Sequence, residues 1–161
     1  MDILRFDVFA DSPYGRKVED YVKLTQADIS TLLSSCFVGN FEFYAGGVDF
    51  GSRGTGEGQL WMAQAFLGAI EALDSEKNSR VNFFDSLGGI EMRRSGAVVE
   101  VSAEHVNGRA SIDFEKLLSL ARSAFLELLS GIFEKYSDLP KNPAMFSFVA
   151  DHERLRSEFS K

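Results

Sequence analysis

One uninterrupted amphipathic stretch constrains the fold of this chain more than any other part of it. From Asp113 to Tyr136 the sequence has no proline, and apolar residues recur at steps of three and four. These residues are Phe114, Leu117, Leu118, Ala121, Phe125, Leu128, Ile132 and Tyr136. The spacing predicts one long helix with a wide apolar face. Such a face requires a partner surface, which the rest of the chain must supply.

Short alternating segments directly before this helix are the candidate partner. Turn signals separate them at Ser86 to Gly89, at Ser95-Gly96 and at Asn107-Gly108. The alternating apolar residues are Val81, Phe83, Ile90, Met92, Val99, Val101, Ala103, Ala110 and Ile112. The pattern predicts an antiparallel β-meander of about four strands, packed by the long helix. With additional helices elsewhere in the chain, the expected fold class is α+β.

Two further strands are expected in the N-terminal part, residues 1 to 50. The first holds a rough alternation of apolar and charged residues around Ile3, Phe6, Val8 and Phe9. The second runs from Phe41 to Phe50, where Gly46-Gly47 predicts a bulge or a bend. We expect these two strands to pair.

Three further helices are also expected. Thr25, with Asp28 three residues later, is an acidic variant of a capping box and predicts a short helix through Ile29 and Cys36. Leu60 to Leu73 is rich in alanine and predicts a largely buried helix. After two prolines that end the long helix, a surface helix is expected from Ala144 to about Phe159.

The segment Gly51 to Gly58 is the clearest structure breaker in the sequence. It lacks the Gly-Lys-Ser/Thr ending of a phosphate-binding loop, lacks GxGxxG, and carries Glu57 where a phosphate would sit. We therefore interpret it as a flexible connection. It separates the N-terminal part from residues 58 to 136, within a single domain of residues 1 to 161.

Composition narrows the classes of function. With 45% hydrophobic and 25% charged residues, the 161-residue chain has the composition of a globular protein. Its net charge of -7 disfavours direct binding of nucleic acid and favours a basic protein partner. The alternative is that the acidity serves solubility alone.

Cys36 is the only cysteine, so an intramolecular disulfide is impossible and a reducing, cytoplasmic location is expected. We predict it to be a buried, unreactive thiol on the apolar side of its helix. The N-terminus does not resemble a signal peptide, and no stretch reaches the roughly 18 apolar residues of a membrane span. A soluble protein is therefore expected.

The titratable residues do not form a recognisable catalytic or metal-binding motif. His105 and His152 lack the spacing of metal ligands, although a dyad of His105 with Asp113 across the hairpin can be imagined. Solvated histidines are the favoured interpretation, so we expect no catalytic residue, cofactor or metal. Trp61 is expected in the core, with stacking on a ligand left open.

Three carboxylates of the predicted meander form a more interesting group. Alternation places Glu91, Glu100 and Glu104 on the face opposite the apolar residues. Arg93 and Arg109 interleave with them, which favours a solvated face or a docking surface over a catalytic pair of carboxylates.

The predicted elements follow one another as a helix at Leu60 to Leu73, strands in VNFFDSLGGIEMRRSG and AVVEVSAEHVNGRASIDF, and the helix LLSLARSAFLELLSGIFEKY. This order resembles that of a known group of proteins. These are the small acidic immunity proteins of bacterial polymorphic-toxin and contact-dependent growth-inhibition systems. The resemblance covers Gly58 to Tyr136. It implies a non-catalytic cytoplasmic antitoxin that binds a cognate toxin domain, commonly a basic nuclease, and occludes its active site.

Acidic residues outnumber basic ones by 16 to 10 in residues 1 to 112 and by 8 to 7 in the remainder. The expected partner-binding residues therefore lie in the first part, at Asp49, Glu57, Glu91, Glu100 and Glu104. Two other functions stay open. One is an enzyme or small-ligand-binding protein built around Trp61, Tyr44 and the Gly-rich segment, and the other is a structural or adaptor subunit that uses the last helix as its interface.

Overall fold

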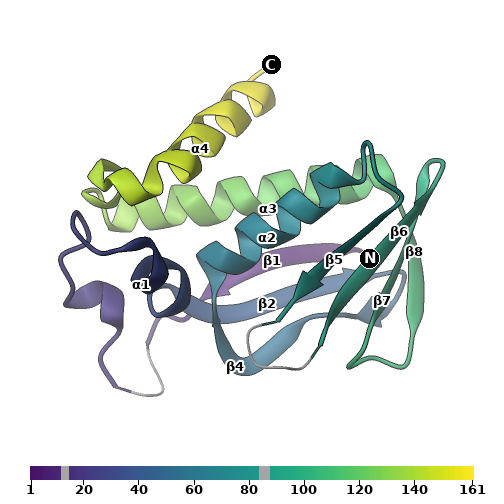
Figure 1. Ribbon diagram of the computed structural model, residues 1–161, viewed down its shortest axis with the longest axis horizontal. Helices are drawn as coiled ribbons and strands as arrows, with labels where there is room; N and C mark the ends of the chain where they lie inside the picture. The colour runs from purple at the N-terminus through teal and green to yellow at the C-terminus, as the bar shows by residue number, and fades with distance from the viewer. Residues whose placement is uncertain (12–14, 84–87) are drawn as a thin grey trace.

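The computed structural model describes residues 1–11, 15–83 and 88–161. Its described part contains two antiparallel four-stranded sheets together with α-helices that pack on them (Figure 1). The fold class is therefore α+β, as the sequence predicts.

The first sheet is built around the predicted pair of N-terminal strands. β1 (Ile3–Val8) pairs with β2 (Val38–Ala45) along its whole length, which confirms the expected pairing. β2 turns back at Gly46-Gly47 into the short β3 (Val48–Asp49), and both glycines have positive φ. The glycines therefore make a tight hairpin turn, in place of a bulge or bend within one strand.

The interpretation of Gly51 to Gly58 as a flexible connection is wrong. Ser52–Gly58 forms β4, which pairs with β2. A Cβ atom on Gly51 would lie 2.6 Å from the carbonyl oxygen of Phe41, and one on Gly58 would lie 1.9 Å from that of Leu33. Both glycines are thus required for close approach of two backbones, a role that glycine also plays inside strands.

The second sheet is the predicted meander. Its strands are β5 (Asn78–Asn82), β6 (Gly89–Ser95), β7 (Val98–Ala103) and β8 (Arg109–Asp113), each paired with the next. The turns at Ser95-Gly96 and Asn107-Gly108 lie between strands as expected. The turn predicted at Ser86 to Gly89 falls largely on residues 84–87, outside the described residues.

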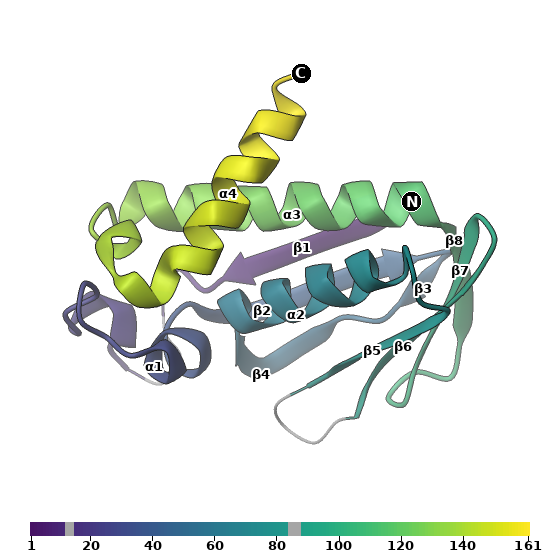
Figure 2. The same ribbon diagram turned by 45° about the horizontal axis from the view of Figure 1, so that its top comes forward.

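The helices lie against the two sheets (Figures 1 and 2). The long helix is α3 (Phe114–Lys135), and α2 (Gln59–Ala72) lies beside it. α3 packs mainly on α2 and β1. The first residues of α3 follow β8 directly, and there the helix contacts the meander, whereas α2 packs on β5. The long helix therefore spans from the second sheet to the far end of the first.

The shorter helices complete the architecture. α4 (Phe146–Phe159) begins two residues after the expected start at Ala144. It packs on α3 and buries Phe148 and Leu155. α1 (Ile29–Ser34) begins after Asp28, whose carboxylate accepts a 2.8 Å hydrogen bond from the backbone N–H of Thr31. Asp28 is thus the N-cap, and the prediction that Thr25 caps this helix is wrong. Short 3₁₀ helices occupy Val18–Asp20, Leu139–Lys141 and Pro143–Met145.

One hydrophobic core joins both sheets and the helices, and it is rich in phenylalanine. The aromatic rings buried most completely are those of Phe37, Phe41, Phe43, Phe50, Phe66, Phe114, Phe125 and Phe148. Cys36 is buried in the same core, and burial, with a further contribution from the Glu19 carboxylate, raises the pKa of its thiol to about 12. Over the described residues, none of the helices has the length and apolar character needed to cross a membrane.

Candidate functional site

The exposed side of the meander carries three of the predicted partner-binding residues. We call this surface the outer face and define it by Asn78, Arg80, Glu91, Arg93, Glu100, Ser102, Glu104 and Arg109. The predicted alternation is confirmed, because Glu91 and Glu100 are exposed while Met92 and Val101, their neighbours in sequence, are buried.

Arg80 organises one side of the outer face. Register places it directly opposite Glu91, and its guanidinium lies 2.7 Å from the Glu91 carboxylate. The same guanidinium pairs with Glu104 and donates a 2.6 Å hydrogen bond from Nε to Asn82. The two carboxylates, Glu104 first, raise the pKa of Arg80 above its ordinary value. Arg80 was absent from the sequence-based site, because only the register shows that it lies between the two acids.

A second ion pair lies on the other side of this face. Arg109 Nη1 is 3.3 Å from the carboxylate of Glu100 on β7. Arg93, on β6, lies directly opposite Glu100 in the register of the two strands. The outer face thus presents three arginines and three glutamates in alternating positions. Its formal charges cancel, so the net negative charge of the chain resides elsewhere.

The outer face is hollowed. One hollow of about 540 Å³ and an adjoining one of about 440 Å³ share Glu91, Ser102 and Arg109 in their walls. The alternating charges therefore line a continuous shallow depression, a shape into which a convex surface can fit.

Asp49 and Glu57 do not join this face. Asp49 lies on β3 of the first sheet, where its carboxylate accepts a 2.9 Å hydrogen bond from the backbone N–H of Gly51. Glu57 lies on β4 and is only 4% exposed, so its carboxylate is enclosed by the protein. The structure therefore groups three of the five predicted docking residues and sets two apart.

The imagined His105–Asp113 dyad is not formed. His105 Nε2 lies 3.3 Å from the carbonyl oxygen of Gly51, whereas the Asp113 carboxylate accepts from the backbone N–H of Lys116 and caps α3. His152 lies 3.0 Å from Ser130 Oγ, and burial, followed by Arg156, lowers its pKa. In the described ranges, no three His, Cys, Asp or Glu side chains gather into a set that could hold a metal ion.

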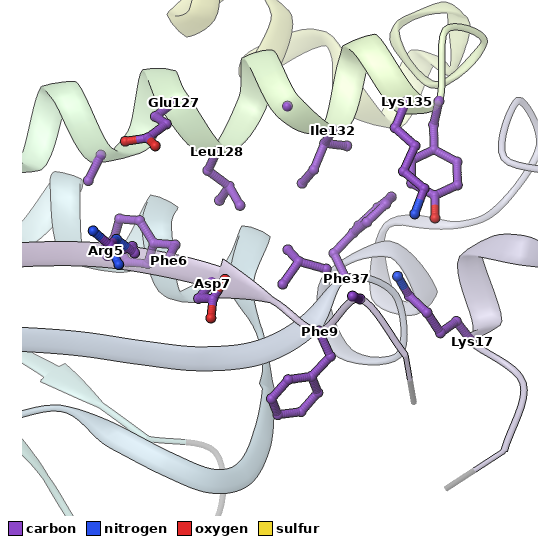
Figure 3. Close-up of a pocket in the computed structure, with 15 residues that line it drawn as sticks. Arg5, Phe6, Asp7, Phe9, Lys17, Phe37, Glu127, Leu128, Ile132 and Lys135 are labelled. Carbon is purple, nitrogen blue, oxygen red and sulfur yellow. The ribbon is translucent and has the colours of Figure 1, made fainter. Parts of the chain in front are cut away.

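Sequence reasoning missed a groove between β1 and the C-terminal half of α3. It has a volume of about 350 Å³, an apolar floor that includes Phe6, Phe37 and Ile132, and charged side chains at its rim (Figure 3). Its walls come from segments more than 100 residues apart, so no local pattern announces it. Trp61 and Tyr44, the centre of the expected small-ligand site, do not line it.

Comparison of this chain with protein-family models, with curated proteins and with solved structures gives no match.

Proposed function

We propose that the chain is a non-catalytic immunity protein that acts in the cytoplasm, binding a cognate bacterial toxin domain and occluding its active site. The outer face is the docking surface in this proposal. The observation that carries it is the placement of Arg80 between Glu91 and Glu104 in an exposed hollow.

Ordered charges favour a binding role for this face. Arginine is among the residues that most often dominate the affinity of protein interfaces. Here the guanidinium groups of Arg80 and Arg109 are each held by a carboxylate on a neighbouring strand, so part of their side-chain entropy is lost before a partner arrives. Binding then costs less side-chain entropy than it would if these arginines rotated freely.

The charge pattern favours a selective partner. A surface with balanced arginines and glutamates attracts neither sign at long range, but it requires both signs in register at contact. The net charge of -7 on the whole chain still favours approach of a basic domain. Attraction and discrimination thus come from different parts of the molecule, which suits an inhibitor of one basic toxin.

The test is co-expression of the chain with the product of the gene immediately upstream, followed by purification and calorimetry. We expect a one-to-one complex and loss of the toxic activity of the partner. Arg80→Glu should weaken binding at least 30-fold, equivalent to about 2 kcal/mol for a charge pair broken at an interface.

Lys141→Glu is the matched control, because Lys141 is 71% exposed and forms a local ion pair with Asp138. It reverses the same charge away from the outer face and should leave affinity unchanged. Equal affinity of the wild type and Arg80→Glu would exclude the outer face as the docking surface. Failure of the chain to bind any toxin domain or protect cells from one would exclude the function itself.

A further inference from the structure

The first sheet has an open edge at β1. Among the described strands, β1 pairs on one side only, with β2. Directly after the last paired residues of β1 and β2, Val8 and Gly39, the N–H of Phe9 donates a hydrogen bond to the carbonyl oxygen of Val38. In an antiparallel pair the bonded residues alternate, so Asp7 and Arg5 also bond toward β2. The backbone N–H and C=O groups of Leu4, Phe6 and Val8 therefore point away from β2, toward the edge.

One stripe of α3 faces this edge across the groove. The residues that α3 contributes to the groove follow helical spacing and are Ala124, Glu127, Leu128, Gly131, Ile132 and Lys135. Gly131 keeps the groove open, because a Cβ atom added there would meet no atom within 4 Å. A backbone edge and an apolar helix face thus line one space.

The two ends of the groove differ in charge. At the end where β1 finishes, the amino groups of Lys17 and Lys135 approach from opposite sides (Figure 3). The Lys17 side chain is 10% exposed and lies 3.7 Å from the buried Glu19 carboxylate. The other charged residues that line the groove are Arg5, Asp7 and Glu127, which contribute one basic and two acidic side chains. The groove therefore favours a negative group at one end only.

We propose that this groove binds an extended peptide segment as an additional strand on β1. Backbone groups of the peptide bond to those of Leu4, Phe6 and Val8, which is the strand-addition mode of recognition. Alternate apolar side chains of the peptide pack against Leu128 and Ile132. An acidic residue of the peptide lies between Lys17 and Lys135. This site is separate from the outer face and goes beyond the proposed function.

Two other occupants fit the geometry less well. A fatty acid would use the apolar floor and the lysines but would leave the backbone edge of β1 unpaired. A second copy of this chain would bring its own α3 along with its β1, because the two elements pack together, so it would not present an isolated strand to the groove. An isolated extended peptide satisfies the edge, the floor and the charged end together.

The first test pans a displayed library of random decapeptides against the wild type and against Gly131→Leu. The substitution fills the groove at a helical glycine with open space around it, so folding should be retained. Gly68→Leu is the matched control, since Gly68 is an exposed helical glycine on α2 with open space and lies outside the groove. Melting temperatures of both variants verify that they fold.

We expect peptides with alternating apolar residues and an acidic residue at one end. Wild type and Gly68→Leu should retain them, and Gly131→Leu should lose at least 10-fold in affinity. Lys135→Glu should remove the preference for the acidic residue. If no sequence is enriched, or if the enriched peptides bind Gly131→Leu equally well, the proposal is wrong. Binding of dodecanoate in the groove without any enriched peptide would also overturn it.

The second test measures amide hydrogen exchange with the best peptide bound. The amides of Leu4, Phe6 and Val8 should exchange fast in the free protein and become protected at least 10-fold on binding. The amides of Arg5 and Asp7 already bond to β2 and should change little. Protection that does not follow this alternation would exclude strand addition.

Discussion

The backbone N–H of Phe37 donates a 3.0 Å hydrogen bond to the buried carboxylate of Glu19. Phe37 has a φ of +55°, the left-handed conformation that side chains other than glycine rarely adopt. Its ring is fully buried and meets Tyr136 edge to face, with 5.5 Å between ring centroids. The carboxylate therefore holds a strained residue at the point where the chain enters β2.

Glu19→Ala should lower the free energy of unfolding by about 2 to 3 kcal/mol, because it removes a charged acceptor from a buried donor. Glu19→Gln keeps an acceptor oxygen and should cost less. Urea denaturation measures both, with the exposed Glu76→Ala as control, which should stay within about 0.5 kcal/mol of the wild type. A Glu19→Ala variant as stable as Glu76→Ala would contradict a structural role for this bond.

Gly58→Ala and Gly68→Ala should have opposite effects on stability. A Cβ atom at Gly58 would lie 1.9 Å from the Leu33 carbonyl oxygen, so two backbone segments must separate, at a cost of at least about 2 kcal/mol. Gly68 is exposed within α2 with open space around it, and alanine there should add about 0.5 to 1 kcal/mol through helix propensity. Thermal and urea unfolding report both changes. Tolerance of alanine at Gly58 would show that β4 does not need this close approach.

Arg80 and Glu91 should contribute little to folding stability despite their 2.7 Å contact. Their side chains are 35% and 62% exposed, and ion pairs in such positions typically give less than about 1 kcal/mol. A double-mutant cycle with Arg80→Ala and Glu91→Ala measures the coupling energy directly. A coupling above about 2 kcal/mol would mean that the outer face is part of the folding framework, because surface pairs do not reach that value.

Stability should fall at alkaline pH through Cys36. Burial raises the pKa of this thiol from 9.0 to about 12, so the unfolded chain releases its proton at lower pH than the folded protein. The folded state then binds more protons, and the stabilisation present below pH 9.0 is lost as pH rises toward about 12. Cys36→Ser should show a shallower decline in chemical denaturation between these values. An identical slope in both proteins would contradict the assignment.

Titration of Tyr136 should also lower folding stability at alkaline pH. Burial, and next its hydrogen bond to Asp20, raise the pKa of its phenol above the ordinary value, so the folded state holds this proton too. Tyr136→Phe should remove the corresponding alkaline loss while also deleting a 2.8 Å bond to Asp20. The slope of the unfolding free energy against pH above pH 10 reports the titration, whereas the difference in stability at pH 7 reports the lost hydrogen bond.

The elements predicted correctly from the sequence are those with a periodic pattern of apolar residues. The unbroken helical spacing predicted α3, and the alternation around Met92 and Val101, with a turn signal at Asn107-Gly108, predicted the meander and its exposed face. Both patterns depend on burial, which the identity of the residues determines directly. β4 was missed because Gly51 and Gly58 are needed for close backbone approach, whereas glycines ordinarily mark flexible turns.

Tertiary relationships could not be predicted in this way. Arg80 belongs to the outer face only because β5 pairs with β6 in one particular register. Glu57 has a titratable side chain and was expected to meet a partner, yet the pairing of β4 with β2 encloses it. The groove depends on how α3 lies along the edge of β1, and these two elements are more than 100 residues apart in the sequence.

The length of α3 sets the spacing between the two candidate binding surfaces. The helix begins directly after β8, at the sheet that carries the outer face, and its C-terminal half lines the groove. Its 22 residues correspond to about 33 Å at 1.5 Å per residue, which exceeds the radius of a small globular domain. The groove and the hollows of the outer face have no lining residue in common. If both proposals hold, the protein is bivalent, with a folded partner on the outer face and a linear segment in the groove.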